Sequence, residues 1–268
     1  MPVKPVALSI AGFDTSAGAG LQADLLTFHN RGYHCVTAAT SLVVESPLEV
    51  SKVQTVPAEL LRQQVSLLLE TYPVAAIKIG LLSSPEQVFL LSEILAKQTA
   101  PIVLDPVGIS STGTTLQEEG TAIALVNDLA PLVTLITPNL PEVETLLGGQ
   151  TEKKPEDAAR QLADKTGTSI LLTGGHHGEG LEITDTLVSK DTLSRYCAPA
   201  IPNATSLHGT GCVLSSAISA GLGQGESLSN AIERARRYLR EAMQNHLIFP
   251  HSKPLLALNH HSKGGHDQ

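Results

Sequence analysis

Five consecutive residues, His208-Gly209-Thr210-Gly211-Cys212, have the types and spacing needed to hold a phosphate group and to accept a proton. Apolar residues recur at three- and four-residue steps directly after them, which predicts a helix that begins at this glycine-rich turn. The first N–H groups of a helix are unpaired and its dipole adds positive charge, so the turn favours an anion or a transferring phosphoryl group. The same field lowers a thiol pKa, which makes Cys212 a candidate base. A helix start with a buried cysteine explains these residues equally well.

Other polar residues directly follow short apolar runs. Asp105 ends such a run, and an acid in that position can hold magnesium or its waters, or form a turn. Asn139 and Glu142 have the spacing of a capping box, which competes with a role in organising magnesium near phosphates. The paired glycines of Thr173-Gly174-Gly175-His176 permit a sharp turn close to a nucleotide.

A further glycine-rich stretch, residues 12–20, follows the first apolar run and would let a ligand approach the backbone. Asp24 lies in the first turns of the helix expected after it. This carboxylate either stabilises the helix dipole or contacts a hydroxyl or ring of the substrate.

Apolar runs alternate with segments of helical periodicity. Strands are expected at Val6–Ala11, Val36–Val44, Ala75–Ile79, Ile102–Leu104, Val133–Ile136 and Ile170–Leu172, and helices near residues 19–31, 58–71, 85–97, 117–128, 139–147, 155–165 and 227–245. This order predicts an α/β fold of three layers, in which a central, mostly parallel sheet has helices on both faces. Two later runs, Thr184–Ser189 and Leu193–Ala198, predict an antiparallel hairpin that extends the sheet. Ligands bind beyond the carboxyl ends of strands in such folds, where the polar motifs fall.

Composition limits the possible functions. The 268 residues carry a formal net charge of −8, which argues against nucleic-acid and anionic-membrane partners. The three cysteines lack zinc spacing, and neither a signal peptide nor a long apolar run is evident, so we expect a reduced, cytoplasmic protein. We expect one domain over residues 1–250, followed by a polar, flexible tail over 251–268.

The chain resembles the ribokinase-like superfamily, and within it the hydroxymethylpyrimidine and phosphomethylpyrimidine kinases of thiamine biosynthesis. The resemblance spans residues 7 to about 240. It rests on the segments 11–14, 18–24, 77–82, 104–107, 136–142, 174–176 and 208–212, and Cys212 in place of aspartate separates this branch from the sugar kinases.

The resemblance implies phosphorylation, dependent on ATP and Mg²⁺, of 4-amino-5-hydroxymethyl-2-methylpyrimidine, its monophosphate, or both, by a protein that is commonly a homodimer. It implies a catalytic group formed by Gly209, Thr210, Gly211 and Cys212. It implies substrate contacts from Gly12, Asp24, Glu45, Leu81 and Val107. It implies that Asp105, Asn139, Glu142, Thr173 and Gly175 organise nucleotide and metal, without a closed metal site built by the protein.

Several positions depart from the family pattern. Glu45 stands where the family usually has a glutamine that pairs with the pyrimidine edge, and an ionised carboxylate only accepts hydrogen bonds. Thr173 and Leu81 replace a common lysine and methionine, and residues 108–113 are also altered. Two alternatives to the pyrimidine kinase therefore stay open: a kinase of pyridoxal or a related vitamer, and a non-catalytic paralogue that binds the ligand.

Overall fold

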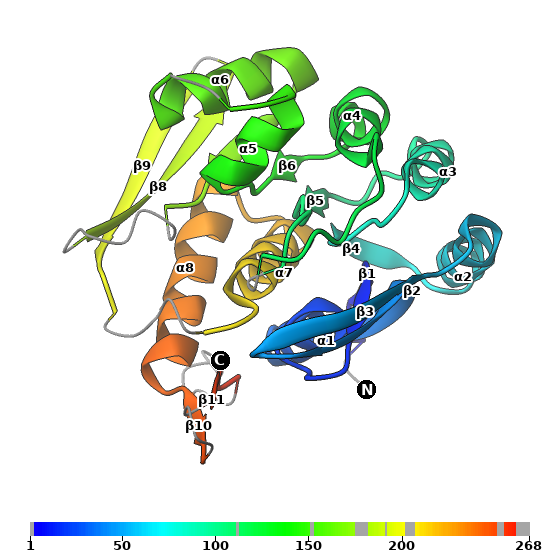
Figure 1. Ribbon diagram of the computed structural model, residues 1–268, viewed down its shortest axis with the longest axis horizontal. Coiled ribbons are helices and arrows are strands. Elements are labelled where there is room, and N and C mark those ends of the chain that lie inside the picture. The colour runs from blue at the N-terminus through cyan, green and yellow to red at the C-terminus, as the bar shows by residue number, and fades with distance from the viewer. Residues whose placement is uncertain are drawn as a thin grey trace.

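A nine-stranded sheet forms the centre of the molecule (Figure 1). The computed structural model describes residues 3–110, 113–150, 153–174, 182–190, 192–201, 207–250 and 255–260. In sequence order the strands are β1 (Val6–Asp14), β2 (His34–Ser46), β3 (Glu49–Thr55), β4 (Val74–Ile79), β5 (Ile102–Leu104), β6 (Leu135–Ile136), β7 (Ser169–Leu172), β8 (Glu182–Ser189) and β9 (Thr192–Pro199). Their spatial order is β3-β2-β1-β4-β5-β6-β7-β8-β9. The strands from β2 to β7 run parallel and the outer strands β3, β8 and β9 run antiparallel, which confirms the expected sheet and its hairpin extension.

Helices cover both faces of this sheet, as expected for three layers (Figure 1). They are α1 (Gly20–Asn30), α2 (Ala58–Thr71), α3 (Pro85–Leu95), α4 (Thr121–Ala124), α5 (Leu140–Leu147), α6 (Pro155–Thr166), α7 (Thr210–Gly223) and α8 (Leu228–Gln244). Successive strand residues point to opposite faces, so Ile102 and Leu104 pack with α2, α3, α5 and α6, whereas Val103 packs with α7 and α8. Within the described part of the chain, no helix is both long and apolar enough to cross a membrane.

The helix expected near residues 117–128 differs in form. It begins only after Gly120, whose φ of 85° is left-handed, and α4 contains a single turn. The chain then continues as a π-type turn, η1 (Leu125–Leu129), and a 3₁₀ turn, η2 (Ala130–Leu132), which contains Pro131. Periodicity alone does not distinguish these helix types, because all of them place apolar residues on one side.

The expected flexible tail is wrong for residues 255–260. Strand β11 (Leu255–Ala257) pairs antiparallel with β10 (Leu247–Phe249), and the side chains of Leu258 and His260 are buried. His260 Nδ1 lies 3.2 Å from the hydroxyl of Tyr238 on α8. Apolar residues within a polar stretch therefore dock this segment. Residues 251–254 and 261–268 lie outside the described residues.

Candidate active site

The amino end of α7 forms an open group of backbone N–H donors. Gly209 has a φ of 81°, and a Cβ atom built on it would lie 1.9 Å from the carbonyl oxygen of Gly18, so only glycine fits this turn. Thr210 and Gly211 begin the helix, and in the described structure no side chain caps it. The first N–H groups of α7 are therefore available to an anion.

The glycine-rich loop before α1 is filled by the protein itself. The Asp14 carboxylate accepts hydrogen bonds from the backbone N–H groups of Ser16, Gly18 and Ala19 at 2.6, 2.9 and 2.8 Å. Burial alone would raise the pKa of Asp14, but these bonds and those from the side chains of His208 and Ser16 hold it below its usual value. A ligand anion would have to displace Asp14 here, so α7 offers the better anion site.

Asp105 lies beside the first turn of α7. Its side chain is buried, and its Oδ2 accepts a hydrogen bond of 3.1 Å from Ser215 of that helix. A methyl group on Gly211 would lie 3.6 Å from the same oxygen, which shows how closely the carboxylate faces the helix start. Burial raises the pKa of Asp105, although the positive charge of Lys78 opposes this.

The expectation of a lowered thiol pKa at Cys212 is wrong. The side chain is buried, and burial raises the pKa of Cys212 to about 12, although the positive charge of Lys78 acts in the opposite direction. Removing the thiol from water disfavours the thiolate by more than the nearby charge and the helix end favour it. Cys212 is therefore a protonated thiol at neutral pH.

The substrate contact expected of Asp24 is also wrong. Both Asp24 oxygens lie within 2.9 Å of Lys78 Nζ, and both side chains are fully buried. The hydroxyls of Ser9 and Ser216 donate to the same carboxylate at 2.6 and 2.8 Å. Asp24 is thus enclosed where α1, α7, β1 and β4 meet. The signal for its partner was a single lysine inside the apolar run of β4, which sequence reasoning did not use.

Asn139 and Glu142 form the capping box that their spacing predicted. The Asn139 side chain accepts from the Glu142 N–H at 2.9 Å, and the Glu142 carboxylate accepts from the Asn139 N–H at 2.8 Å. Burial and the negative charge of Asp105 raise the pKa of Glu142 to about 8. Thr173 pairs with Asn139 in an isolated bridge, so the ends of β6 and β7 lie side by side. Gly175 and His176 lie outside the described residues.

Three of the expected substrate residues, Gly12, Leu81 and Val107, lie close together near the carboxyl ends of β1, β4 and β5. A Cβ atom on Gly12 would lie 3.2 Å from the Leu81 side chain, and Leu81 packs in a small apolar cluster with Val43, Leu116 and Val107. A planar ring of low polarity could rest against such a cluster.

Glu45 lies in a group of ionisable side chains with Asp14 and His208. His208 Nε2 lies 3.5 Å from an Asp14 oxygen and 3.8 Å from a Glu45 oxygen. Burial and the charge of Asp14 raise the pKa of Glu45 to about 7, while His208 opposes the shift. The sequence analysis did not predict that Asp14 and His208 lie beside Glu45, although both belong to motifs singled out there.

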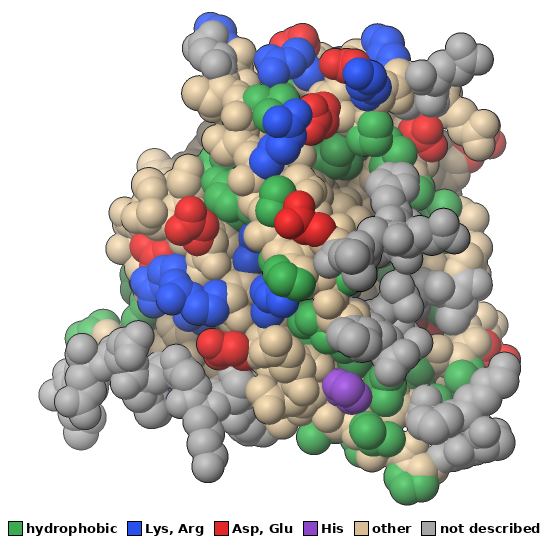
Figure 2. All heavy atoms as spheres, turned by 90° about the vertical axis from the view of Figure 1, so that its left-hand side faces the viewer, with side chains coloured by type: hydrophobic (Ala, Val, Ile, Leu, Met, Phe, Trp, Pro, Cys, Tyr) green, Lys and Arg blue, Asp and Glu red, His purple; other side chains and the backbone are tan. Residues whose placement is uncertain are grey.

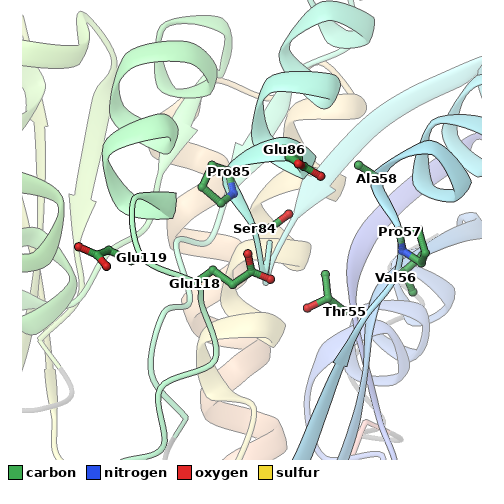
Figure 3. A pocket seen from close by; sticks show the side chains of 9 residues that line it. All are labelled: Thr55, Val56, Pro57, Ala58, Ser84, Pro85, Glu86, Glu118 and Glu119. Carbon is green, nitrogen blue, oxygen red and sulfur yellow. The ribbon is translucent and has the colours of Figure 1, made fainter.

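A surface groove of about 440 Å³ lies between α2 and α3, where the chain enters these helices (Figure 3). It contains none of the residues discussed above, and Glu86, Glu118 and Glu119 line it. Three carboxylates make it unsuited to a nucleotide.

Comparison with known proteins decides the family. The family model described as phosphomethylpyrimidine kinase matches residues 14–254. The chain belongs to the phosphomethylpyrimidine kinase family. A hydroxymethylpyrimidine/phosphomethylpyrimidine kinase of Rhizobium meliloti is 36% identical over 240 residues, which cover 89% of this chain and 90% of that protein.

Solved structures resemble this phosphomethylpyrimidine kinase family member over most of its length. A pyridoxal kinase from Staphylococcus aureus, solved with pyridoxal, has a TM-score of 0.86 at 27% identity and covers 98% of this chain and 96% of its own. The same kinase has been solved with AMP-PCP and pyridoxal. A phosphomethylpyrimidine kinase from Clostridium difficile has a TM-score of 0.75 at 31% identity, and the match covers 90% of this chain and 100% of that one.

Proposed function

We propose that this protein transfers the terminal phosphoryl group of ATP to 4-amino-5-hydroxymethyl-2-methylpyrimidine, to its monophosphate, or to both, in thiamine biosynthesis. The names of its relatives support this acceptor. The observation that carries the proposal is the open amino end of α7, which faces the buried Asp105 carboxylate. Phosphoryl transfer depends mainly on positioning and on charge stabilisation, and a helix start beside a metal-binding acid supplies both.

In this proposal Gly209, Thr210 and Gly211 form the anion hole for the transferring group. Cys212 stands next to it and accepts the proton of the substrate hydroxyl. Because the thiol is protonated in the free protein, it must first release its own proton to solvent, and only the resulting thiolate accepts the hydroxyl proton, late in a loose transition state.

The residues present fit Mg²⁺. Asp105 is buried and Glu142 is half-buried, and a negative charge on one disfavours ionisation of the other; a divalent cation would relieve that repulsion. Neither belongs to a closed group of three or more metal ligands among the described residues. We propose that both hold magnesium largely through its waters, as is usual for a nucleotide-bound ion, and that magnesium neutralises charge on the phosphates. Asn139, Thr173 and Gly175 are proposed to lie along the nucleotide.

The ring is proposed to rest on Gly12, Leu81 and Val107, with Glu45 at its polar edge. A second candidate acceptor is pyridoxal, which is favoured by the likeness to the Staphylococcus aureus enzyme and by an acid in place of the usual amide. Because the anion hole serves either acceptor, Glu45 and its neighbours determine which ring is used.

We further propose that the protein is a cytoplasmic homodimer that pairs through the outer ends of β1 and β2. Phe13, Leu42, Val44 and Leu48 are large apolar side chains that are 42 to 50% exposed, and Phe13 and Leu42 are partners in the strand register. An apolar patch of this kind is typical of a protein interface. The substitution Leu42→Lys is expected to shift the mass measured by sedimentation from that of a dimer to that of a monomer. A wild-type protein that sediments as a monomer would contradict the proposed dimer.

An ADP-release assay tests the function. Purified protein is supplied with ATP and magnesium and with hydroxymethylpyrimidine, its monophosphate or pyridoxal as acceptor. We expect the highest kcat/KM with one of the two pyrimidines. Faster turnover of pyridoxal would establish the second candidate, and binding without turnover of any acceptor would support a non-catalytic paralogue.

A further inference from the structure

Asp185 connects the end of β7 to helix α8. One carboxylate oxygen accepts a hydrogen bond of 2.8 Å from the backbone N–H of Gly174, and the other accepts one of 2.7 Å from Nε of Arg236. The Asp185 side chain is largely buried, and that of Arg236 is 13% exposed. Two charge-assisted hydrogen bonds in a site of low polarity hold the carboxylate in one orientation.

Arg236 is itself held in place. Its guanidinium carbon lies 5.9 Å from the centre of the Tyr196 ring, a cation–π contact, and Tyr196 is the register partner of Asp185 across β8 and β9. Figure 2 looks onto the side of the molecule where β8, β9 and α8 lie. Asp185 therefore depends on a rigid support rather than on a mobile surface side chain.

The Thr173-Gly174 segment has little freedom between its neighbours. A Cβ atom on Gly174 would lie 2.1 Å from the carbonyl oxygen of Thr184, so the segment packs directly on β8. On its other side the Thr173 N–H donates to the carbonyl of Pro138 at 2.9 Å, and Thr173 pairs with Asn139. The segment thus lies at the carboxyl end of β7, beside the capping box of α5.

We propose that Asp185, supported by Arg236, is a positioning residue for nucleotide binding. It fixes the Thr173-Gly174 segment against the edge of the sheet where the proposed function places ATP, and the inference rests on that function. Without the carboxylate, the Gly174 N–H loses its partner and the segment can move away from Asn139. The expected defect is in the binding of an adenine nucleotide rather than of the acceptor ring, which is proposed to lie at β1, β4 and β5.

Four variants test this proposal. Asp185→Leu removes both hydrogen bonds, Asp185→Asn keeps one oxygen able to accept from Gly174, and Arg236→Met removes only the support. Arg195→Met is the matched control, because Arg195 lies on the neighbouring strand β9 and this change breaks its exposed ion pair with Glu156 of α6. The measurements are the KM values for ATP and for the acceptor, the Kd of ADP by calorimetry, and the melting temperature.

We expect Asp185→Leu to raise the KM for ATP and the Kd of ADP about tenfold, the factor that matches one charged hydrogen bond. The acceptor KM and the control variant should remain unchanged, and Asp185→Asn should recover most of the affinity. If Asp185→Leu does not fold, Arg236→Met decides, with weaker ADP binding than wild type. Unchanged ADP affinity in folded variants, or equal shifts of both KM values, would overturn the proposal. The ADP titration needs no turnover, so it remains decisive even if wild type phosphorylates none of the acceptors.

Discussion

Lys78 Nζ lies 2.8 Å from Asp24 Oδ1, and neither side chain is exposed to solvent. The pair joins β4 to α1, and Ser216 of α7 donates to the same carboxylate. An ammonium group in the interior needs such a partner, and Asp24 raises the pKa of Lys78 even though burial acts to lower it. The ion pair therefore fastens together the helix starts that surround the proposed site.

Removing one partner should be more harmful than removing both. Lys78→Met leaves a buried carboxylate unpaired and is expected to reduce the free energy of unfolding by about 3–5 kcal/mol. The double variant Lys78→Met/Asp24→Asn leaves no buried charge at the pair and should recover a large part of that loss. Urea unfolding measures both, and a double variant no more stable than Lys78→Met would contradict the assignment.

Cys212 should be needed for transfer but not for folding. Serine fits the same space, so Cys212→Ser is expected to keep the melting temperature and the ATP affinity and to lose at least about a hundredfold in kcat, the scale of general-base effects. Cys35→Ser, a change at a thiol outside the proposed site, serves as the control. Full turnover by Cys212→Ser would remove the cysteine from the mechanism.

Glu142 has a structural and a proposed electrostatic role, and one substitution separates them. Glu142→Gln keeps an oxygen that accepts the Asn139 N–H, so the capping box and the stability should survive. The loss of negative charge is expected to raise the magnesium concentration needed for half-maximal activity about tenfold, the effect of losing one charged contact. A magnesium titration of activity tests this. Protein prepared without nucleotide at low magnesium should contain no bound metal. One tightly bound ion per protein molecule would contradict the proposal that the protein forms no closed metal site.

Glu45 should make activity on the pyrimidine depend on pH. Because its folded-state pKa is about 7, Glu45 is protonated below that pH and can then donate a hydrogen bond as an amide does. Glu45→Gln is expected to lower the KM for hydroxymethylpyrimidine above pH 7, and the two proteins should converge below it. If the KM of wild type and that of Glu45→Gln change with pH in the same way, Glu45 points away from the ring.

The same raised pKa has a consequence for stability. The folded protein keeps the proton of Glu45 to higher pH than the unfolded chain, whose carboxyl titrates near 4.5. The contribution of Glu45 to stability therefore falls as pH rises from about 4.5 to about 7. Glu45→Gln should remove this part of the pH dependence, as thermal unfolding across that range would show.

Periodicity and position predicted the sheet, its helices and the edge at which polar motifs gather. Alternation of apolar runs with helical segments was sufficient, because a buried parallel strand needs apolar side chains on both of its faces. In β5, Ile102 and Leu104 pack on one face of the sheet and Val103 packs on the other. The expectations for Asp24 and Cys212 failed for one reason. Burial is set by segments distant in sequence, and Asp24 and Lys78 are separated by 54 positions. Docking of residues 255–260 was missed for the same reason.

The two glycines of the α7 turn give the most direct test of the anion hole. Gly209→Ala would meet the Gly18 backbone and is expected not to fold. A methyl group on Gly211 meets only the Asp105 carboxylate among the described atoms, at ordinary contact distance, and alanine favours a helix. That methyl enters the space proposed for the transferring phosphoryl group. The decisive measurement is kcat/KM of Gly211→Ala with hydroxymethylpyrimidine, alongside its melting temperature. We predict an unchanged or raised melting temperature with kcat/KM at least about a hundredfold lower, the scale of a lost oxyanion-hole donor. Wild-type kcat/KM in this variant would contradict phosphoryl transfer at the start of α7.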